Sequence, residues 1–520
     1  MKSRSQKAIF SLLTGLIGEI VLILTNLISR KVLCDVLGTE YLGISSLFTS
    51  ILSMLSLAEL GVGTSIIYHM YKPVAEDNKI RIYQLLMFFR KAYHIIGIVI
   101  SAVGLIILPM LSFLIDDVPG DVNVYILFLI YLLQTIASYF FRGYKSALLQ
   151  ANQKQYSINI VTLVSSVVTS LSQIAVLIIF KNIYFYIGVR ALTTILQNLL
   201  VAWWCDKSYP EILKLKGETL PKEDQRSILK DCYALLIYRI NGVMLYSVDG
   251  LIITKVLGLV VNGIYSNYSW ISTTIKNFTK LLFKSVENGV GNKHASVKTA
   301  DIDSDKTLSE EFSVFRCLNL LSVIINGVAL TGIVNVADIF IATYFGKDMT
   351  ISLMAVILLA LDVYISGIAS LISTYRKAYG LFQQAKYRPI ASTVSNLVIS
   401  LLLVKPLGLV GILIGTVVSV FGTTVMYDSY IVYKCAFKKK AFVFHRTNTL
   451  YLVITAAGCT FTCVTSVYGF GFITNAWVQI IIRTALSVII PLAVYFITLG
   501  RTKEFARLLT YVKNILKRGE

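Results

Sequence analysis

The sequence predicts an all-α polytopic membrane protein with about 14 transmembrane helices. We expect two parallel six-helix lobes around a central cavity, plus two additional C-terminal helices. Three observations predict this fold: the chain is apolar throughout, its apolar runs have the length of membrane spans, and two ordered patterns recur at nearly one offset.

Composition places the chain in a bilayer. Of its 520 residues, 56% are apolar and only 15% are charged, which is typical of membrane proteins rather than of soluble domains. A helix needs roughly 20 consecutive apolar residues to cross the hydrocarbon core. The stretch from Tyr93 to Ile115 meets this requirement with His94 as its only ionisable group.

Similar apolar runs follow one another along the whole chain. We predict spans near 8–33, 42–68, 93–115, 122–141, 157–180, 183–204, 232–254, 258–283, 317–344, 351–374, 389–404, 407–433, 450–468 and 474–499. The first run follows basic residues, as a signal peptide does. It is long, contains Glu19 and lacks a small-residue cleavage site, so we expect a retained first helix.

The distribution of basic residues supports this topology. Lysine and arginine collect in the cytoplasmic loops of membrane proteins. With both termini inside, most of the 48 basic residues fall in the tails and inner loops. The net charge of +20 therefore does not require a nucleic acid, and the basic inner loops are expected to face an anionic leaflet.

Span order and loop length predict the domain boundaries. We expect an N-terminal six-helix lobe at 1–206, a cytoplasmic linker at 207–231 and a C-terminal six-helix lobe at 232–434. Two additional transmembrane helices at 450–499 and a basic cytoplasmic tail at 500–520 complete the chain.

Two patterns indicate an internal duplication. VLG at 36–38 with GI at 43–44 recurs at 256–258 and 263–264, and the segment starting at Tyr144 and Lys145 recurs at Tyr375 and Arg376. Six spans separate equivalent points, and an even number returns a helix to the same orientation. The halves are therefore parallel repeats, which typically form a cavity at their interface and move by alternating access.

Basic residues within the spans are the candidate ligands of an anionic substrate, because a charge at membrane depth is costly and usually faces a cavity. Arg190 lies mid-span and is the best candidate. Snorkelling towards headgroups is the alternative for the lysines. The candidate cavity cations are Arg30, Arg142, Arg190, Arg239, Lys276 and Lys280.

Acidic residues within the spans are candidates for coupling transport to H+ or Na+, and a structural ion pair is the alternative for each. Glu19, Glu59 and Asp249 are the main candidates. We expect no bound cofactor and no metal site. Cys459 and Cys463 stand one helical turn apart, but packing explains them better than metal binding because no further ligand is near in the sequence.

Longer stretches resemble a known family. SVDGLIITKVLGLVVNGIYSNY is similar to the seventh span of bacterial polysaccharide flippases, and LGTEYLGISSLFTSILSMLSLAELGVGTSI is similar to their second span. SVENGVGN and PLGLVGILIG add support. The resemblance is to the capsule and O-antigen branch of the multidrug/oligosaccharidyl-lipid/polysaccharide exporter superfamily.

The resemblance implies a flippase of the bacterial plasma membrane. Such a protein moves undecaprenyl-pyrophosphate-linked oligosaccharide from the inner to the outer leaflet, and its cationic lumen attracts pyrophosphate. A polysaccharide polymerase and glycosyltransferases are candidate partners. Asp249 falls on the acidic position of the seventh-span motif.

Two other functions remain as alternatives. A cation-coupled multidrug antiporter of the same superfamily should have an acidic, aromatic cavity, whereas several candidates here are basic. A membrane polymerase or ligase should carry a sizeable outer loop with catalytic side chains, and we expect only short outer loops. The sequence contains no G-x-x-x-x-G-K-[ST] phosphate loop, which argues against an ATP-driven pump.

Overall fold

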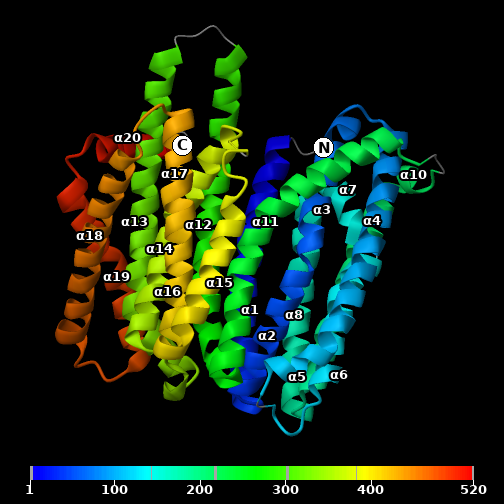
Figure 1. Ribbon diagram of the computed structural model, residues 1–520, viewed down its shortest axis with the longest axis horizontal. Helices are drawn as coiled ribbons and strands as arrows, with labels where there is room; N and C mark the ends of the chain where they lie inside the picture. Colours follow the sequence, from blue (N-terminus) through cyan, green and yellow to red (C-terminus); the bar gives the residue numbers. More distant parts are fainter. Residues whose placement is uncertain are drawn as a thin grey trace. The chain divides into compact units, whose positions relative to one another are not determined.

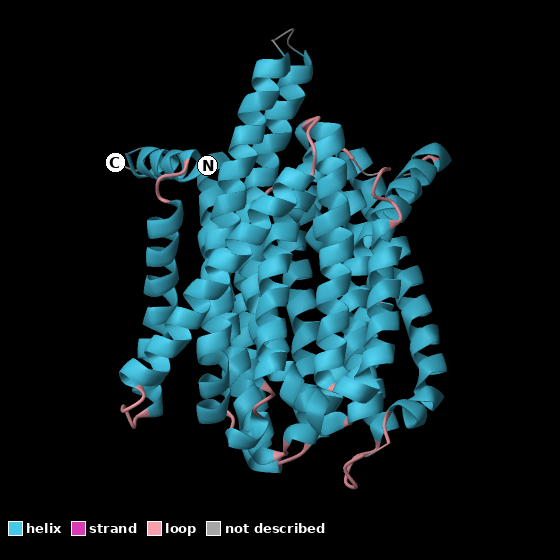
Figure 2. Cartoon of the chain, turned by 60° about the vertical axis from the view of Figure 1, so that its left-hand side comes forward, coloured by secondary structure: helices cyan, strands magenta, loops and turns pink. Residues whose placement is uncertain are grey.

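The computed structural model is helical throughout the part of the chain it describes, namely residues 4–116, 118–141, 143–215, 219–299, 304–381 and 383–517. Figure 2 shows helices joined by loops in that part, with no strand. Contacts divide the chain into two compact units, 1–263 and 264–520. Each is described by itself.

The first unit contains eleven α-helices and the start of a twelfth (Figure 1). They are α1 (Arg4–Val36), α2 (Thr39–Leu55), α3 (Leu57–Ala75), α4 (Lys79–Ile107), α5 (Leu111–Leu114), α6 (Val124–Phe140), α7 (Ser146–Ala151), α8 (Gln155–Phe180), α9 (Ile183–Ser208), α10 (Pro210–Leu213), α11 (Lys222–Leu257) and α12 (Leu259–Thr299). Within this unit α1 packs on α8, α8 and α6 pack on α9, and α11 packs on α2 and α3.

The second unit continues from α12 and includes the two additional C-terminal helices. Its further helices are α13 (Ser304–Tyr344), α14 (Leu353–Ala378), α15 (Arg388–Leu407), α16 (Leu409–Val420), α17 (Ser429–Ile431), α18 (Phe442–Val464), α19 (Ala476–Leu499) and α20 (Lys503–Lys517). Here α13 is central, because α14, α18, α19 and α20 all pack against it.

All fourteen predicted span ranges fall on helical segments. Among the described residues, nine helices are long and apolar enough to cross a membrane, or ten if the bent pair of Val124–Phe140 and Gly143–Ala151 is one span. The chain is a multi-pass membrane protein, and the count of fourteen stays a prediction. The contact boundary at Gly263 places α11 in the first unit, although the repeat assigns this helix to the second predicted lobe.

The predicted second span is interrupted. The sequence predicts one helix over 42–68, whereas the structure has α2 and α3 on either side of Ser56. The Ser56 hydroxyl donates to the Leu52 carbonyl at 2.9 Å. Such bonds to the preceding turn compete with the backbone ladder and bend helices.

Polar caps fix where several helices begin. A side-chain oxygen of the residue before the helix accepts from the first-turn backbone N–H groups of α4, α6, α9, α14 and α19, and the capping residues are Asn78, Asn123, Asn182, Ser352 and Asn475. These bonds satisfy donors that have no partner within the helix.

The duplicated corner has the same backbone conformation in both copies. Gly38 precedes α2 with φ 112° and ψ 171°, and Gly258 precedes α12 with φ 91° and ψ 168°. These dihedral angles favour glycine over any residue with a Cβ. The repeat in the sequence is therefore also a repeat in backbone geometry.

The two copies of the corner also contact each other inside the first unit. A Cβ on Gly43 would lie 2.1 Å from the Leu259 carbonyl oxygen, and a Cβ on Gly263 would lie 2.4 Å from that of Thr39. Asn262 Nδ2 donates to the Gly43 carbonyl at 3.1 Å. The glycines allow α2 and the start of α12 to approach backbone to backbone.

Candidate functional site

Two predicted cations of the first unit lie beside tyrosines. α1 supplies Ser29 and Arg30, and α9 supplies Tyr186 and, one turn later, Arg190. The hydroxyls of Ser29 and Tyr186 are 3.0 Å apart. Arg30 is electrostatically coupled to Tyr186, and Arg190 to Tyr131 of α6. We call Arg30, Tyr131, Tyr186 and Arg190 the arginine–tyrosine cluster.

Unused hydroxyls border this cluster. Tyr131 is only 3% exposed and packs edge-on against Phe48, with ring centroids 5.4 Å apart. The hydroxyls of Tyr131 and Ser45 are neighbours, and among the described residues no other group forms a hydrogen bond with either of them. Because a buried hydroxyl without a partner costs about 1–3 kcal/mol, these groups favour a ligand that bonds them.

The arginine–tyrosine cluster is suited to an anion. Arg190 is exposed and forms no ion pair with the described part of the chain, and Arg30 is partly exposed. A guanidinium group presents a planar fork of donors that matches the oxygens of a phosphate. Each of these guanidinium groups, beside phenol and serine hydroxyls, is therefore suited to a phosphate-bearing headgroup.

Lys276 lies in a different environment, in the second unit. Its ammonium group forms a buried ion pair with Asp362 of α14, and Ser366 Oγ donates to Asp362 Oδ1 at 3.2 Å. The carboxylate compensates the charge of Lys276 in this structure. Lys280 lies one helical turn further along α12 and is exposed. A substrate-binding role for these lysines stays a prediction.

The predicted acidic residues are spread over several helices. Glu59 of α3 accepts hydrogen bonds from Tyr93 of α4 at 2.7 Å and from Tyr139 of α6 at 2.6 Å. Asp249 on α11 is fully buried, and Glu19 on α1 is exposed. The bonds to Glu59 hold three helices of the first unit together, as a structural acid would.

Two predicted cations are not described. Arg142 lies outside the described residues, and Arg239 belongs to a stretch of α11 whose side chains are not described. Their assignment as cavity cations stays a prediction.

The repeated segments that begin at Tyr144 and Tyr375 each place a basic side chain in an ion pair. Lys145 forms an ion pair with Asp206 of α9, and the Lys145 side chain is 9% exposed. In the second unit, Arg376 Nε lies 3.1 Å from Asp428, whose carboxylate also faces Arg388 Nε at 3.5 Å. Both units thus tie the repeated segment to an aspartate of a later helix.

Sequence reasoning missed several of these partners. Asp206 and Asp428 stand 222 positions apart, close to the spacing of the duplicated corner, so the repeat itself contained a signal for them. Tyr186 was detectable as the residue one turn before Arg190. Nothing in the sequence around Tyr131 indicates that it approaches Arg190.

A π-helical stretch supports the second of these ion clusters. The helix after α16 widens over Phe421–Asp428. Thr424 and Asp428 both contact Arg388, and Thr424 Oγ1 accepts from Arg388 Nη1 at 2.7 Å. Such widened turns often occur where side chains need special placement.

Comparisons with known proteins show the fold. No protein-family model matches the chain, and no curated protein is similar to it in sequence. The lipid II flippase MurJ in an inward-closed conformation matches with a TM-score of 0.64 and 14% identity, over 94% of this chain and 98% of that one. An inward-facing and an outward-facing structure of a multidrug resistance MATE-family transporter of the MOP superfamily also match.

The inward-facing MATE conformation has a TM-score of 0.60 and 14% identity, over 79% of this chain and 93% of that one. The outward-facing conformation has a TM-score of 0.57 and 14% identity, over 82% and 95%. The chain therefore shares its fold with these flippase and transporter structures, as the sequence predicts.

Proposed function

We propose that the chain is a flippase for undecaprenyl-pyrophosphate-linked oligosaccharide repeat units. It moves them from the inner to the outer leaflet of the bacterial plasma membrane for the synthesis of capsule, O-antigen or another surface polysaccharide. The reaction is a translocation in which no covalent bond forms or breaks, so the chain is not an enzyme in this proposal. Alternating access of the two repeats provides the path.

The arginine–tyrosine cluster carries this proposal. A pyrophosphate is the most concentrated negative charge of the substrate, and Arg190 is an exposed cation on a helix that is apolar enough to span a membrane. Placing arginine there costs several kcal/mol on any scale. A charged ligand that compensates the guanidinium group explains why this position is basic.

The extent of the fold match is a second support. The match with the lipid II flippase covers 94% of this chain, whereas the inward-facing and outward-facing MATE transporters match 79% and 82%. A protein with a lipid-linked substrate therefore resembles this chain over more of its length.

A cation-coupled multidrug antiporter is the second candidate. Glu59, held by two tyrosine hydroxyls, is the observation that favours it. A carboxylate and aromatic rings are the groups that bind organic cations. The arginines of the first unit favour the anion instead.

Reconstitution in liposomes tests the proposal. The purified protein is combined with a labelled short-chain undecaprenyl-pyrophosphate oligosaccharide, and its exposure to an added sugar-cleaving enzyme is followed. Protein-dependent change in the accessible fraction, with sugar length unchanged, is expected. Lengthened sugars would indicate a polymerase, and uptake of a cationic dye under a proton gradient would indicate the antiporter.

Variants connect the activity to the cluster. Arg190→Ala should slow flipping by roughly tenfold or more, because a hydrogen bond to a charged group contributes about 1.5–3 kcal/mol. Arg226→Ala removes an exposed arginine near the start of α11 and is the matched control. Equal flipping rates for the two variants would exclude Arg190 as a substrate ligand.

A further inference from the structure

The last helix of the chain is amphipathic. In α20 the apolar residues Phe505, Leu508 and Leu509 share one face, and Lys503 and Arg507 lie on the opposite face. Three residues separate the start of this helix from the end of α19 at Leu499, and α19 is apolar enough to span a membrane. Figure 2 shows the helix that ends at the C-terminus lying crosswise to the upright helix before it.

Contacts at its first turn hold α20 against the second unit. Glu504 forms an ion pair with Arg316 of α13, and Cys317 Sγ contacts the Glu504 carbonyl oxygen at 3.7 Å. Phe505 is buried and packs on Phe496, with ring centroids 5.8 Å apart. Leu509, one turn further along, is 43% exposed. The orientation of α20 is thus fixed at its start while apolar surface remains open beyond.

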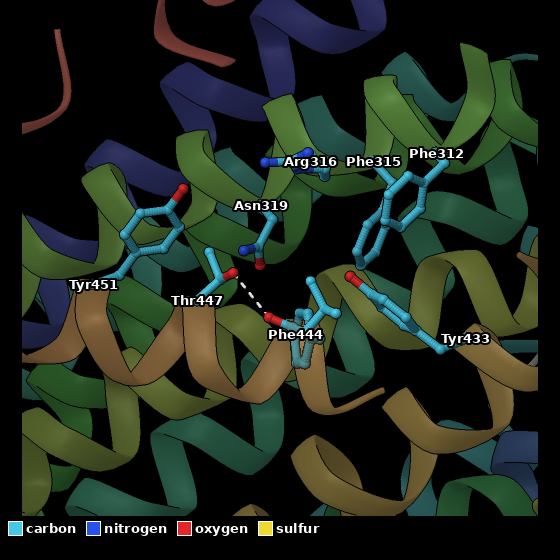
Figure 3. Close-up of a pocket in the computed structure, with 9 residues that line it drawn as sticks. Phe312, Phe315, Arg316, Asn319, Tyr433, Phe444, Thr447 and Tyr451 are labelled. Atoms are coloured by element: carbon cyan, nitrogen blue, oxygen red, sulfur yellow. Dashed lines mark hydrogen bonds between the residues drawn. The ribbon is translucent and has the colours of Figure 1, made fainter. Parts of the chain in front are cut away.

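A basic segment lies on the other side of Arg316. Figure 3 shows Arg316 and Phe312 on α13 at a pocket whose opposite wall includes Phe444 and Thr447 of α18. The segment that leads into α18 places the Lys439 ammonium group 4.9 Å from the centre of the Phe312 ring. Lys439 and α20 therefore approach the same end of α13.

These elements combine many cations with a single acid. Between 434 and 446 and between 501 and 517 the sequence contains only Glu504 as a carboxylate, and Glu504 is already paired with Arg316. The exposed basic side chains of this surface are Lys438, Lys439, Lys440, Arg446, Arg501, Lys503 and Arg507. Its charge is strongly positive and is not balanced by its own residues.

We propose that α20 and residues 438–446 form an interfacial surface that binds anionic phospholipid headgroups of the membrane the chain spans. Basic groups next to an exposed leucine on a helix that starts at a membrane surface match that partner, since such helices insert their apolar face while their cations bind headgroups. The inference is independent of the flippase activity. A cytoplasmic protein is the other partner that an amphipathic helix accepts.

Hydrogen exchange of the full-length protein in nanodiscs tests this surface. We expect the backbone amides of 503–517 to exchange more slowly in phosphatidylcholine mixed with phosphatidylglycerol than in phosphatidylcholine alone, and the difference to disappear at high salt. Each cation near an anionic surface contributes about fivefold in binding. Arg501→Gln with Lys503→Gln should reduce the protection in anionic discs by roughly 30-fold.

This double variant is chosen because neither side chain makes an ion pair with the described part of the chain. Phe505→Ala is the control, because it removes the packing on Phe496 without changing a charge and should accelerate exchange equally in both lipids. Identical protection of wild-type α20 in neutral and anionic discs would overturn the proposal and leave a protein partner. An equal effect of the double variant in both lipids would also overturn it.

Discussion

Gly43→Ala should destabilise the first unit, because the added methyl group would clash where the two copies of the duplicated corner approach backbone to backbone. The added methyl group would lie 2.1 Å from the Leu259 carbonyl oxygen and 2.9 Å from its carbon. Both are backbone atoms, so α2 and the start of α12 must separate by about 1 Å to restore ordinary contact. Overpacking of this kind costs about 1–3 kcal/mol.

Two smaller effects adjust this value. Separation also weakens the hydrogen bond from Asn262 to Gly43, which contributes about 0.5–1.5 kcal/mol. Alanine is better than glycine inside a helix by about 1 kcal/mol. The net expectation is a loss of about 2 kcal/mol, which corresponds to a fall in Tm of about 5 °C for a unit of this size.

Thermal unfolding of the purified protein, followed by intrinsic fluorescence, measures this change. Gly332→Ala is the matched control, since Gly332 lies inside α13 and nothing stands within 4 Å of its added Cβ. Gly263→Ala should behave like Gly43→Ala, and the double variant should cost less than the sum because both act on one contact. A Gly43→Ala protein as stable as the Gly332→Ala protein would refute the reasoning.

Three further predictions concern buried polar contacts. Asp428→Asn should destabilise the second unit by about 3–5 kcal/mol, because two buried arginines lose their carboxylate; thermal unfolding should show a far smaller effect for the exposed Asp348→Asn. Asn335→Ala should cost about 1–3 kcal/mol, because Asn335 bonds serines of the two C-terminal spans at 2.9 and 3.0 Å; faster hydrogen exchange in α19 but not in α15 would show this. Glu59→Gln should cost about 1–2 kcal/mol, since an amide accepts two tyrosine hydroxyls less well; unchanged unfolding would mean that these bonds contribute nothing.

Local patterns determined much of the fold. Apolar run length placed helices on all fourteen predicted ranges, and the repeated VLG predicted a shared corner that the positive φ of Gly38 and Gly258 matches. These features depend on nearby residues only. The break at Ser56 is also local, because the Ser56 hydroxyl bonds to the carbonyl of the preceding turn. The length of the apolar run nevertheless predicted one continuous helix.

The sequence indicated only part of the electrostatics within the helices. It identified Arg30, Arg190 and Lys276 as residues that need a partner, because an ionisable group in a span is costly. It did not identify the partners. Only the tertiary structure shows that Lys276 of α12 is compensated by Asp362 of α14, whereas Arg190 keeps an exposed side chain beside Tyr131.

The physical reason is the range of the interactions. Helix formation and membrane insertion depend on the composition of some 20 neighbouring residues, so the sequence by itself determined that this chain is a helical membrane protein with an internal repeat. An ion pair forms only when two side chains lie within a few ångströms of each other in space, even if they are far apart in the sequence. Lys276 and Asp362, for example, are 86 positions apart. Tertiary structure alone decided which cations are neutralised and which keep an exposed side chain.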